Sequence, residues 1–206
     1  MAQEEVPAGK SIESVIGEEL RSSAHRREKV IEMLQAAGFQ MYDQETGEAV
    51  GCPAEYVRDG LRFGQLSGGQ KHLIYILKYF ARALAFLSKG EAQVLLVCDE
   101  VLGGIDAIRQ PRVLRMLKQL QEMKKISILY ISTELHQIFL MSDDVAFLQE
   151  GIICELGPAR AVLELPKHSA TKSYVREFRS LPGGEHLGGK LAQAYAQLAA
   201  LDHGWL

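Results

Sequence analysis

Long apolar runs, paired cysteines and a large excess of one charge are all missing from this sequence of 206 residues. No stretch approaches the roughly 18 uninterrupted apolar residues that a membrane-spanning helix needs, and residues 1–10 hold no apolar signal-peptide core. The net charge of −3 argues against generic nucleic-acid binding. We therefore expect a soluble, cytoplasmic protein.

The cysteines are few and scattered. Cys52, Cys98 and Cys154 are odd in number and form no CxxC pair, so the sequence suggests neither a disulfide framework nor a metal site. Cys98 and Cys154 lie inside apolar runs, and we expect both to be small core residues.

A complete phosphate-binding P-loop is also missing. The run Gly9-Lys10-Ser11 imitates the end of the pattern GxxxxGK[ST], but Glu4 stands where the first glycine belongs and no strand precedes it. Without that glycine the chain lacks the tight turn that wraps the phosphates. We interpret Ser11 as the cap of a following helix.

The residues that are present suit an α/β domain, since 47% are hydrophobic and their spacing alternates between helical and strand periods. Val94 to Cys98 and Ile126 to Ser132 are short unbroken apolar runs, typical of strands buried on both faces in a parallel sheet. We expect this sheet to be mostly parallel, flanked by helices and edged by a hairpin at 145–155. Helices are expected at 11–20, 26–37, 54–61, 66–85, 108–124, 134–141, 160–165, 171–178 and 190–201. Apart from the short helix at 54–61, the stretch 40–63 is expected to be loop-like.

The run Leu66-Ser67-Gly68-Gly69-Gln70 opens the longest predicted helix. Glycine backbone amides, a serine hydroxyl and the positive end of the helix dipole can converge on a phosphate oxygen there. The alternative is that Ser67 is an ordinary N-cap and the glycines are turn residues. Asp99 and Glu100 follow a buried strand, at the strand end where α/β folds place their ligand crevice.

LSGGQ resembles the signature motif of ATP-binding cassette (ABC) ATPases, and residues 11–175 follow the order of that family's second half. SIESVIGEELR (11–21) and PKHSATK (166–172) are similar to patterns of the branch that powers oligopeptide and dipeptide import. The resemblance implies a partial P-loop NTPase fold of the ABC type with an α-helical subdomain. The domains would be a helical subdomain and loop (1–65), an α/β core with the signature helix (66–180), and a linker with a C-terminal helix (181–206).

The resemblance also implies roles for individual residues. Asp99 would be the Walker B aspartate, which orients a magnesium-bound water, and Glu100 would be the general base of ATP hydrolysis. Asp106 would belong to the D-loop that joins two halves of a dimer. The γ-phosphate of ATP held by a partner's P-loop would be contacted by Ser67, Gly68, Gly69 and Gln70.

Three features depart from the family. The P-loop half is missing, Thr133 stands where the switch histidine of the H-loop is expected, and Val101-Leu102 replaces the usual Pro-Thr. Threonine cannot carry a proton to the γ-phosphate near neutral pH.

These features leave two functional interpretations. In the first, the chain supplies the signature and the Walker B acids to a composite ATP site, and ATP is hydrolysed with Mg²⁺ only when another segment or chain adds a P-loop. In the second, the chain is a non-hydrolysing, degenerate ABC subunit with a structural or regulatory role. A nucleic-acid-acting ABC protein is disfavoured because no basic stripe is present. Expected partners are a second ABC ATPase subunit and a membrane permease, which would hold the protein peripherally at a membrane. Self-association is also expected.

Overall fold

The computed structural model describes residues 5–20, 25–43, 45–88, 90, 93–123 and 125–180. The predicted linker and C-terminal helix in 181–206 lie outside these described residues. The described chain forms two compact units, one from residues within 5–96 and 101–129, the other from 97–100 and 130–180. Each unit is described by itself.

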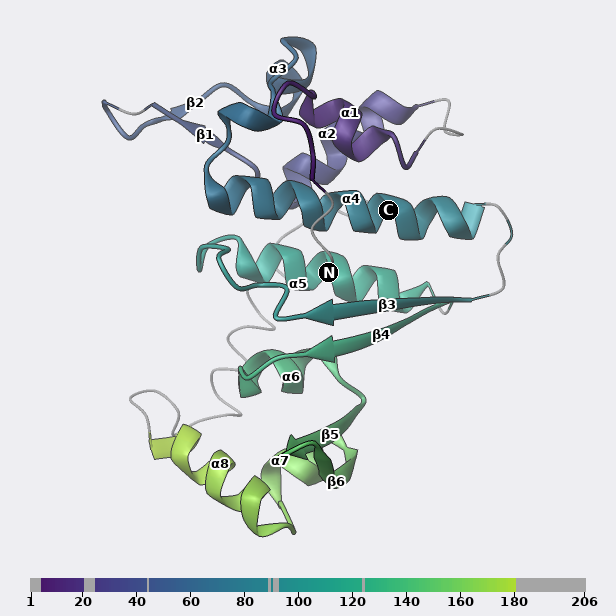
Figure 1. The fold of residues 1–206 in the computed structure, drawn as a ribbon, viewed down its shortest axis with the longest axis vertical. Coiled ribbons are helices and arrows are strands. Elements are labelled where there is room, and N and C mark those ends of the chain that lie inside the picture. Colours follow the sequence, from purple (N-terminus) through teal and green to yellow (C-terminus); the bar gives the residue numbers. More distant parts are fainter. Residues whose placement is uncertain are drawn as a thin grey trace. The chain divides into compact units, whose positions relative to one another are not determined.

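Helices dominate the first unit (Figure 1). Ser11 begins α1 as predicted, because its Oγ accepts a hydrogen bond from the Ser14 amide at 3.2 Å. Helix α1 packs against α4, and α2 packs against both α1 and α3. In order, the elements are α1 (Ile12–Gly17), α2 (Arg26–Ala36), β1 (Met41–Tyr42), β2 (Ala49–Val50), α3 (Pro53–Arg58), a 3₁₀ turn η1 (Phe63–Gln65), α4 (Gly68–Ser88) and α5 (Gln110–Glu122).

The core of this unit follows the helical periods seen in the sequence. Fully buried side chains from α1, α2 and α4 meet there, namely Ile12, Ile16, Met33, Leu34, Leu73, Ile74, Leu77 and Phe80. The prediction failed at 40–50, where β1 and β2 form a small antiparallel hairpin with Met41 opposite Val50. Two-residue strands are too short to leave an alternating pattern in the sequence.

Strands β3 (Val94–Asp99) and β4 (Ile126–Ile131) form a two-stranded sheet. The Val94 amide donates to the Lys125 carbonyl and the Glu100 amide to the Ile131 carbonyl, both at 2.9 Å. The residue numbers of donor and acceptor differ by the same amount in both bonds, which shows that the strands are parallel, as predicted.

The prediction that both faces of these strands are buried is wrong for the described structure. Leu96 and Cys98 are buried on one face, but four apolar side chains of the other face are exposed, namely Leu95, Val97, Leu129 and Ile131. Successive side chains of a strand point to opposite faces, so Leu95 and Val97 share one face of β3, and Leu129 and Ile131 share one face of β4. The hydrogen bonds between the two strands place these two faces on the same side of the sheet.

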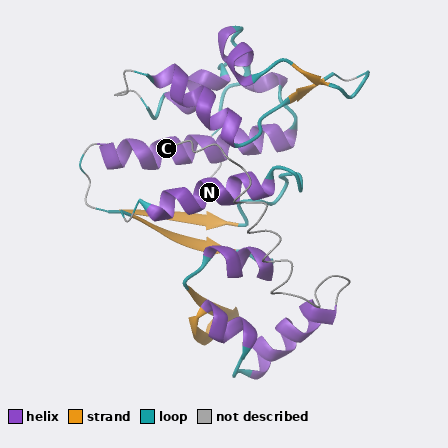
Figure 2. Ribbon diagram, turned by 180° about the vertical axis from the view of Figure 1, so that it is seen from behind, coloured by secondary structure: helices purple, strands orange, loops and turns teal. Residues whose placement is uncertain are grey.

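The second unit contains α6 (Leu135–Met141), β5 (Asp144–Gln149), β6 (Ile152–Pro158), α7 (Ala159–Glu164) and α8 (Ser169–Ser180). Among the described strands, β5 and β6 pair only with each other (Figure 2), so the predicted hairpin exists but is not hydrogen-bonded to the parallel strands. One face of this hairpin packs on α7 and α8 through a small core of Leu135, Val145, Ala159, Val162, Leu163 and Val175.

The cysteine predictions are half right. Cys98 is fully buried, and burial raises the pKa of its thiol to about 12, so it is an inert core residue. Cys154 is only partly buried, because it lies where the pairing register of β5 and β6 shifts. In the described part of the chain, no helix is long and apolar enough to cross a membrane.

Candidate nucleotide-facing site

The LSGGQ run forms the start of α4, and Ser67 and Gln70 cap each other there. The Gln70 amide donates to Ser67 Oγ at 3.3 Å, and the Ser67 amide donates to Gln70 Oε1 at 2.8 Å. This reciprocal arrangement is a capping box, which satisfies two backbone donors of the first turn. The serine cap that the sequence left open as an alternative is therefore present, and it leaves the Ser67 hydroxyl hydrogen free to donate to a ligand.

The first turn of α4 is open on one side. Ser67 and Gly68 are exposed, and no atom lies within 4 Å of the position a Gly68 Cβ would occupy. Amides of a first helical turn lack intrahelical partners and lie at the positive end of the dipole. The geometry thus suits the approach of an anion to the Ser67 hydroxyl and the glycine backbone.

The Gln70 side chain is engaged within the protein. Its Nε2 donates to the Gln40 carbonyl at 2.8 Å and lies 3.5 Å from the Met41 sulfur, while its Oε1 caps the helix. The amide thus anchors the helix start to the chain before β1. A contact between Gln70 and phosphate stays a prediction that this conformation does not display.

A turn at 101–106 packs directly against the signature helix. A Cβ on Gly69 would lie 2.9 Å from the Gly104 carbonyl oxygen, so only glycine permits this approach. The His72 ring nitrogen Nε2 lies 2.8 Å from the Val101 carbonyl oxygen. The sequence did not single out His72, since an isolated histidine on a helix carries no specific signal.

Asp106 ends this turn and caps the next one, at 107–109, which leads into α5. Its Oδ1 accepts hydrogen bonds from the Ile108 and Arg109 amides at 3.2 and 3.1 Å, and its other oxygen pairs with the Arg109 guanidinium. Although partial burial acts to raise the pKa of Asp106, the Arg109 contacts outweigh it and hold that pKa below its usual value. Asp106 is therefore a charged cap.

In the second unit, the end of β3 brings Glu100 next to Thr133. Glu100 has φ 44°, a left-handed conformation that costs energy for a residue with a Cβ and that clusters at functional sites. Its carboxylate Oε1 accepts a hydrogen bond from the Thr133 amide at 3.0 Å. The two residues that the sequence named as general base and H-loop position are thus in direct contact, through the backbone of Thr133.

Tyr174 of α8 also contacts Thr133, and no sequence pattern marks this tyrosine. Its phenol donates to the Thr133 carbonyl at 2.7 Å, so the peptide groups on both sides of Thr133 are engaged. Burial raises the pKa of Tyr174, and the phenol stays a protonated donor at neutral pH. Only the tertiary contact between α8 and the loop after β4 reveals this role.

The neighbouring residues close the other side of this strand end. The phenol of Tyr130 and the hydroxyl of Ser132 both donate to Gln137 Oε1, at 2.7 and 3.3 Å. His136 lies beside Glu134, 3.4 Å between Nδ1 and Oε2, and its ring stacks on Phe178. Its described contacts are thus with Glu134 and Phe178.

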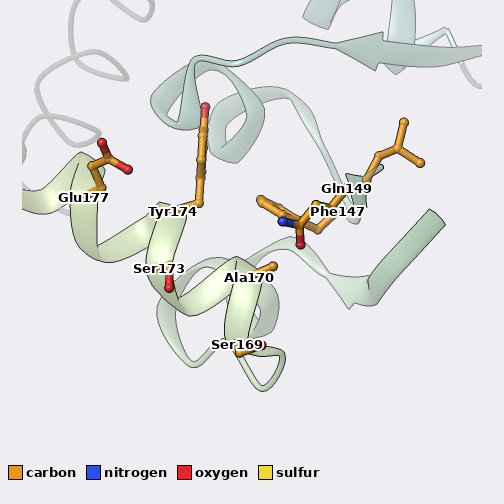
Figure 3. Close-up of a pocket in the computed structure, with 8 residues that line it drawn as sticks. Phe147, Gln149, Ser169, Ala170, Ser173, Tyr174 and Glu177 are labelled. Carbon is orange, nitrogen blue, oxygen red and sulfur yellow. The ribbon is translucent and has the colours of Figure 1, made fainter. Parts of the chain in front are cut away.

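An open groove of about 510 Å³ lies between β5 and α8, where Tyr174 stands beside Phe147 (Figure 3). Three small side chains of α8 help to line it, and Glu177 is the one charged residue in its lining. It is lined by Phe147, Leu148, Gln149, Ser169, Ala170, Ser173, Tyr174 and Glu177.

The donor set at the strand end suits magnesium only in part. Asp99 and Glu100 are exposed carboxylates, and among the described residues no group of three or more His, Cys, Asp or Glu could hold a metal ion. Mg²⁺ is commonly held by one or two carboxylates together with substrate phosphates and waters. The residues present therefore fit a Mg²⁺ that would arrive with a nucleotide, and a role for Asp99 as its protein ligand stays a prediction.

The structure supports the absence of a P-loop at 9–11. Lys10 is paired with Glu18 of the α1 C-terminal turn, and Ser11 caps α1. Both side chains that a P-loop would aim at a nucleotide are committed to the local fold.

No protein-family model matches the chain. It is similar to methionine import ATP-binding proteins MetN, at 36% identity over 113 residues for that of Staphylococcus saprophyticus (55% of this chain, 30% of the relative). For MetN 1 of Staphylococcus epidermidis, the identity is 31% over 151 residues (73% of this chain, 37% of the relative). The chain thus spans about a third of the length of these curated relatives.

A solved structure shows the same fold. A chain of a metal-chelate type ABC transporter in an inward-facing conformation matches with a TM-score of 0.54 and 16% identity, covering 85% of this chain and 61% of that one. Together, the sequence relatives and the shared fold relate this chain to the ATP-binding proteins of ABC transporters, with the α/β architecture of a partial P-loop NTPase.

Proposed function

We propose that the chain supplies signature and Walker B groups to a composite ATP site, whose P-loop comes from another segment or polypeptide. The observation that carries this proposal is the Glu100 contact, in which a carboxylate at a strand end is held by the Thr133 amide with its backbone in a strained, left-handed conformation. Structural strain of this kind is retained where surrounding contacts enforce it, and it accompanies function.

In this proposal, the strand end supplies the hydrolytic groups. Glu100 polarises the attacking water and accepts its proton as general base, while the Thr133 amide orients the carboxylate. Mg²⁺, bound with the nucleotide, would neutralise developing charge on the phosphates. Asp99 would hold that ion or one of its waters.

The start of α4 supplies the electrostatic contact. The Ser67 hydroxyl donates to a γ-phosphate oxygen, and the backbone amides of Gly68 and Gly69 add the positive end of the helix dipole. Gln70 contributes mainly by capping the helix, because both ends of its amide are engaged. Asp106 lies in the D-loop position, which would face the other half of a dimer.

The wider roles of the chain follow its relatives. The methionine import ATP-binding proteins are named for import, so we propose coupling of ATP hydrolysis to transport through a membrane permease and a second ABC subunit. The narrower oligopeptide and dipeptide branch rests on residues 11–21 and 166–172 alone.

Glu100→Gln in the assembled complex with a P-loop-bearing ABC subunit tests the catalytic role. The amide oxygen of glutamine can still accept from Thr133, so the fold should persist while ATP turnover falls by about a hundredfold or more, because the general base is lost. Glu150→Gln is a matched control, since Glu150 is also a left-handed glutamate, at φ 50°, on the β5–β6 turn. Unchanged turnover in Glu100→Gln would contradict the proposal.

The isolated chain should show no saturable magnesium-ATP binding at micromolar concentrations in calorimetry. Tight binding without a partner would mean that the chain carries its own site for the α- and β-phosphates.

A non-hydrolysing subunit is the second candidate. It is favoured by Thr133, whose backbone rather than an imidazole meets Glu100, because the site then lacks a cationic partner for the γ-phosphate. In that case Glu100→Gln and wild type would give the same turnover in the complex, and the chain would contribute only assembly or regulation.

A further inference from the structure

The segment Gly38–Tyr42, which precedes and forms β1, receives side chains from two separate nucleotide-facing elements. Gln70 of the signature helix donates to the Gln40 carbonyl, and Arg109, after the Asp106 turn, donates to the Gly38 carbonyl at 2.9 Å. All these residues belong to the first unit. The sequence places them up to 71 positions apart, so nothing in the sequence pattern links them.

The 38–42 segment is itself held firmly. The Gln40 amide Nε2 donates to the Gly51 carbonyl at 3.1 Å and to the Tyr56 hydroxyl at 2.9 Å, and the Met41 amide donates to the same hydroxyl at 3.2 Å. The Tyr56 hydroxyl in turn donates to the Val50 carbonyl. Hydrogen bonds thus hold the Gly38 and Gln40 carbonyls and the Gln40 side chain. A segment held in this way can transmit a movement of one bound element to the other.

Gly38 is needed for this geometry. It has φ 67°, and a Cβ there would lie 2.7 Å from Arg112 Cδ. Only glycine therefore allows the chain to turn so that the Gly38 carbonyl is presented to Arg109.

Arg109 uses its whole guanidinium group. Nε donates to the Gly38 carbonyl, a terminal nitrogen donates to the Tyr42 hydroxyl at 3.2 Å, and the other pairs with the Asp106 carboxylate. The plane also lies over the Tyr42 ring, 5.6 Å from its centroid. The side chain is only 16% exposed, so these contacts are partly shielded from water. A planar fork of donors is what arginine offers and lysine lacks.

We propose that Arg109 is a positioning residue, which fixes the Asp106 turn to the 38–42 segment. This adds a second connection to the signature helix, beside the direct packing of Gly104 on Gly69. Through Arg109 and Gln70, the two elements move as one body when they are presented to a nucleotide. That last role rests on the proposed function, whereas the mechanical link between the two elements does not.

Amide hydrogen exchange of the free chain tests the link without any nucleotide. Arg109→Gln removes the charge pair and the fork, and exchange should accelerate about fivefold to tenfold in residues 103–112 and also in 67–71, which Arg109 does not contact in any described interaction. A local role for Arg109 would change 103–112 alone, and that result would overturn the proposal. Arg160→Gln is the control, because Arg160 is an exposed arginine of α7 whose described contact is a surface pair with Glu164.

Milder variants keep the test decisive if Arg109→Gln does not fold. Tyr42→Phe removes one hydrogen bond of Arg109 and keeps the ring, and it should accelerate exchange about twofold in the same two regions. Arg109→Lys should give an effect between those of wild type and Arg109→Gln. No change at 67–71 in either variant would contradict the link.

A double-mutant cycle provides the second readout. The changes in the free energy of unfolding caused by Arg109→Gln and Gln70→Ala should be non-additive, as measured by denaturant unfolding. Each substitution loosens the segment to which the other side chain is hydrogen-bonded. The pair Arg160→Gln and Gln70→Ala should be additive. Additivity of the first pair would overturn the proposal.

The outcomes for the link and for the ATP site are separable. In the assembled complex, Arg109→Gln should lower ATP turnover about tenfold while Arg160→Gln has no effect. Coupled exchange together with unchanged turnover in both Arg109→Gln and Glu100→Gln would retain the link and reject the ATP function. If Arg109→Gln accelerates amide exchange at 103–112 but not at 67–71, the link is rejected, whatever the rate of ATP turnover.

Discussion

Single residues at the candidate site stabilise the fold in addition to their proposed chemical roles. Ser67 caps α4, and Asp106 caps the turn before α5. A substitution at either of them therefore changes stability and function together. Glu155 lies outside the candidate site, and its carboxylate accepts hydrogen bonds from the loop before α8. The conservative variants below separate the two contributions.

Ser67→Ala should lower the free energy of unfolding by about 1 kcal/mol, because the hydroxyl that accepts from the Gln70 amide is lost. Ser67→Thr keeps a hydroxyl cap and should lower the free energy of unfolding by less than Ser67→Ala does. Urea denaturation followed by circular dichroism measures both. If alanine and wild type were equally stable, the capping box would contribute nothing.

Glu155 makes stability depend on pH. The backbone amides of Lys167 and His168 donate to its carboxylate at 2.8 and 3.1 Å, and these bonds, that of Lys167 first, lower the pKa of Glu155. A lowered pKa means that the stabilisation is present above the unfolded-state pKa of about 4.3 and is lost as the pH falls through the folded-state value.

Glu155→Gln should therefore destabilise the protein by about 0.5 kcal/mol at pH 7, a small amount because the site is largely solvated. The difference from wild type should shrink as the pH falls below about 4. Thermal unfolding between pH 7 and pH 3.5 measures it. A difference that stays constant over this range would show that the charge of Glu155 plays no part.

At the scale of elements, the contact between α4 and the turn at 101–106 determines the shape of the site. Gly68 and Gly69 are neighbours in the sequence, but a Cβ would meet open space at the first and the Gly104 carbonyl at the second. The sequence presents them as equivalent members of one motif. The packing gives them different roles.

Gly69→Ala should destabilise the protein by about 1–3 kcal/mol, because a backbone oxygen 2.9 Å from the new Cβ must move. Gly68→Ala should be neutral, or stabilising by up to about 1 kcal/mol, since alanine is the better helix former. Denaturant unfolding of the two variants side by side provides the comparison. Equal effects would mean that the two elements do not touch in solution.

At the scale of the whole molecule, the described chain leaves much apolar surface uncovered. Leu95 and Leu129 of the parallel strands are 65% and 51% exposed, and Leu148 and Leu156 of the β5–β6 hairpin are 65% and 70% exposed. Strand edges without a hydrogen-bonded neighbour favour pairing with another chain, and exposed apolar faces favour burial against one.

We therefore predict that the isolated chain self-associates or requires a partner. Sedimentation velocity at tens of micromolar should show species larger than a monomer of 22.9 kDa. The double variant Leu95→Lys and Leu129→Glu should shift the distribution towards monomer, because charges on that face oppose burial. A stable, well-folded monomer at all concentrations of the wild-type chain would contradict this prediction.

The sequence by itself determined the order of elements apart from the β1–β2 hairpin, the cap at Ser11, the start of the signature helix and the position of Asp99 and Glu100 at a strand end. These follow from local rules, since period, capping residues and strand length act over a few positions. The motif LSGGQ also indicated the family that the relatives and the fold support.

Only the tertiary structure decided which residues meet. It paired Glu100 with the Thr133 backbone, placed Tyr174 behind it, engaged the Gln70 side chain at Gln40, and left one face of β3 and β4 exposed. The physical reason is that such contacts join residues far apart in the chain, through backbone groups that every residue carries. Their choice depends on how the elements pack, and no local pattern of side chains records it.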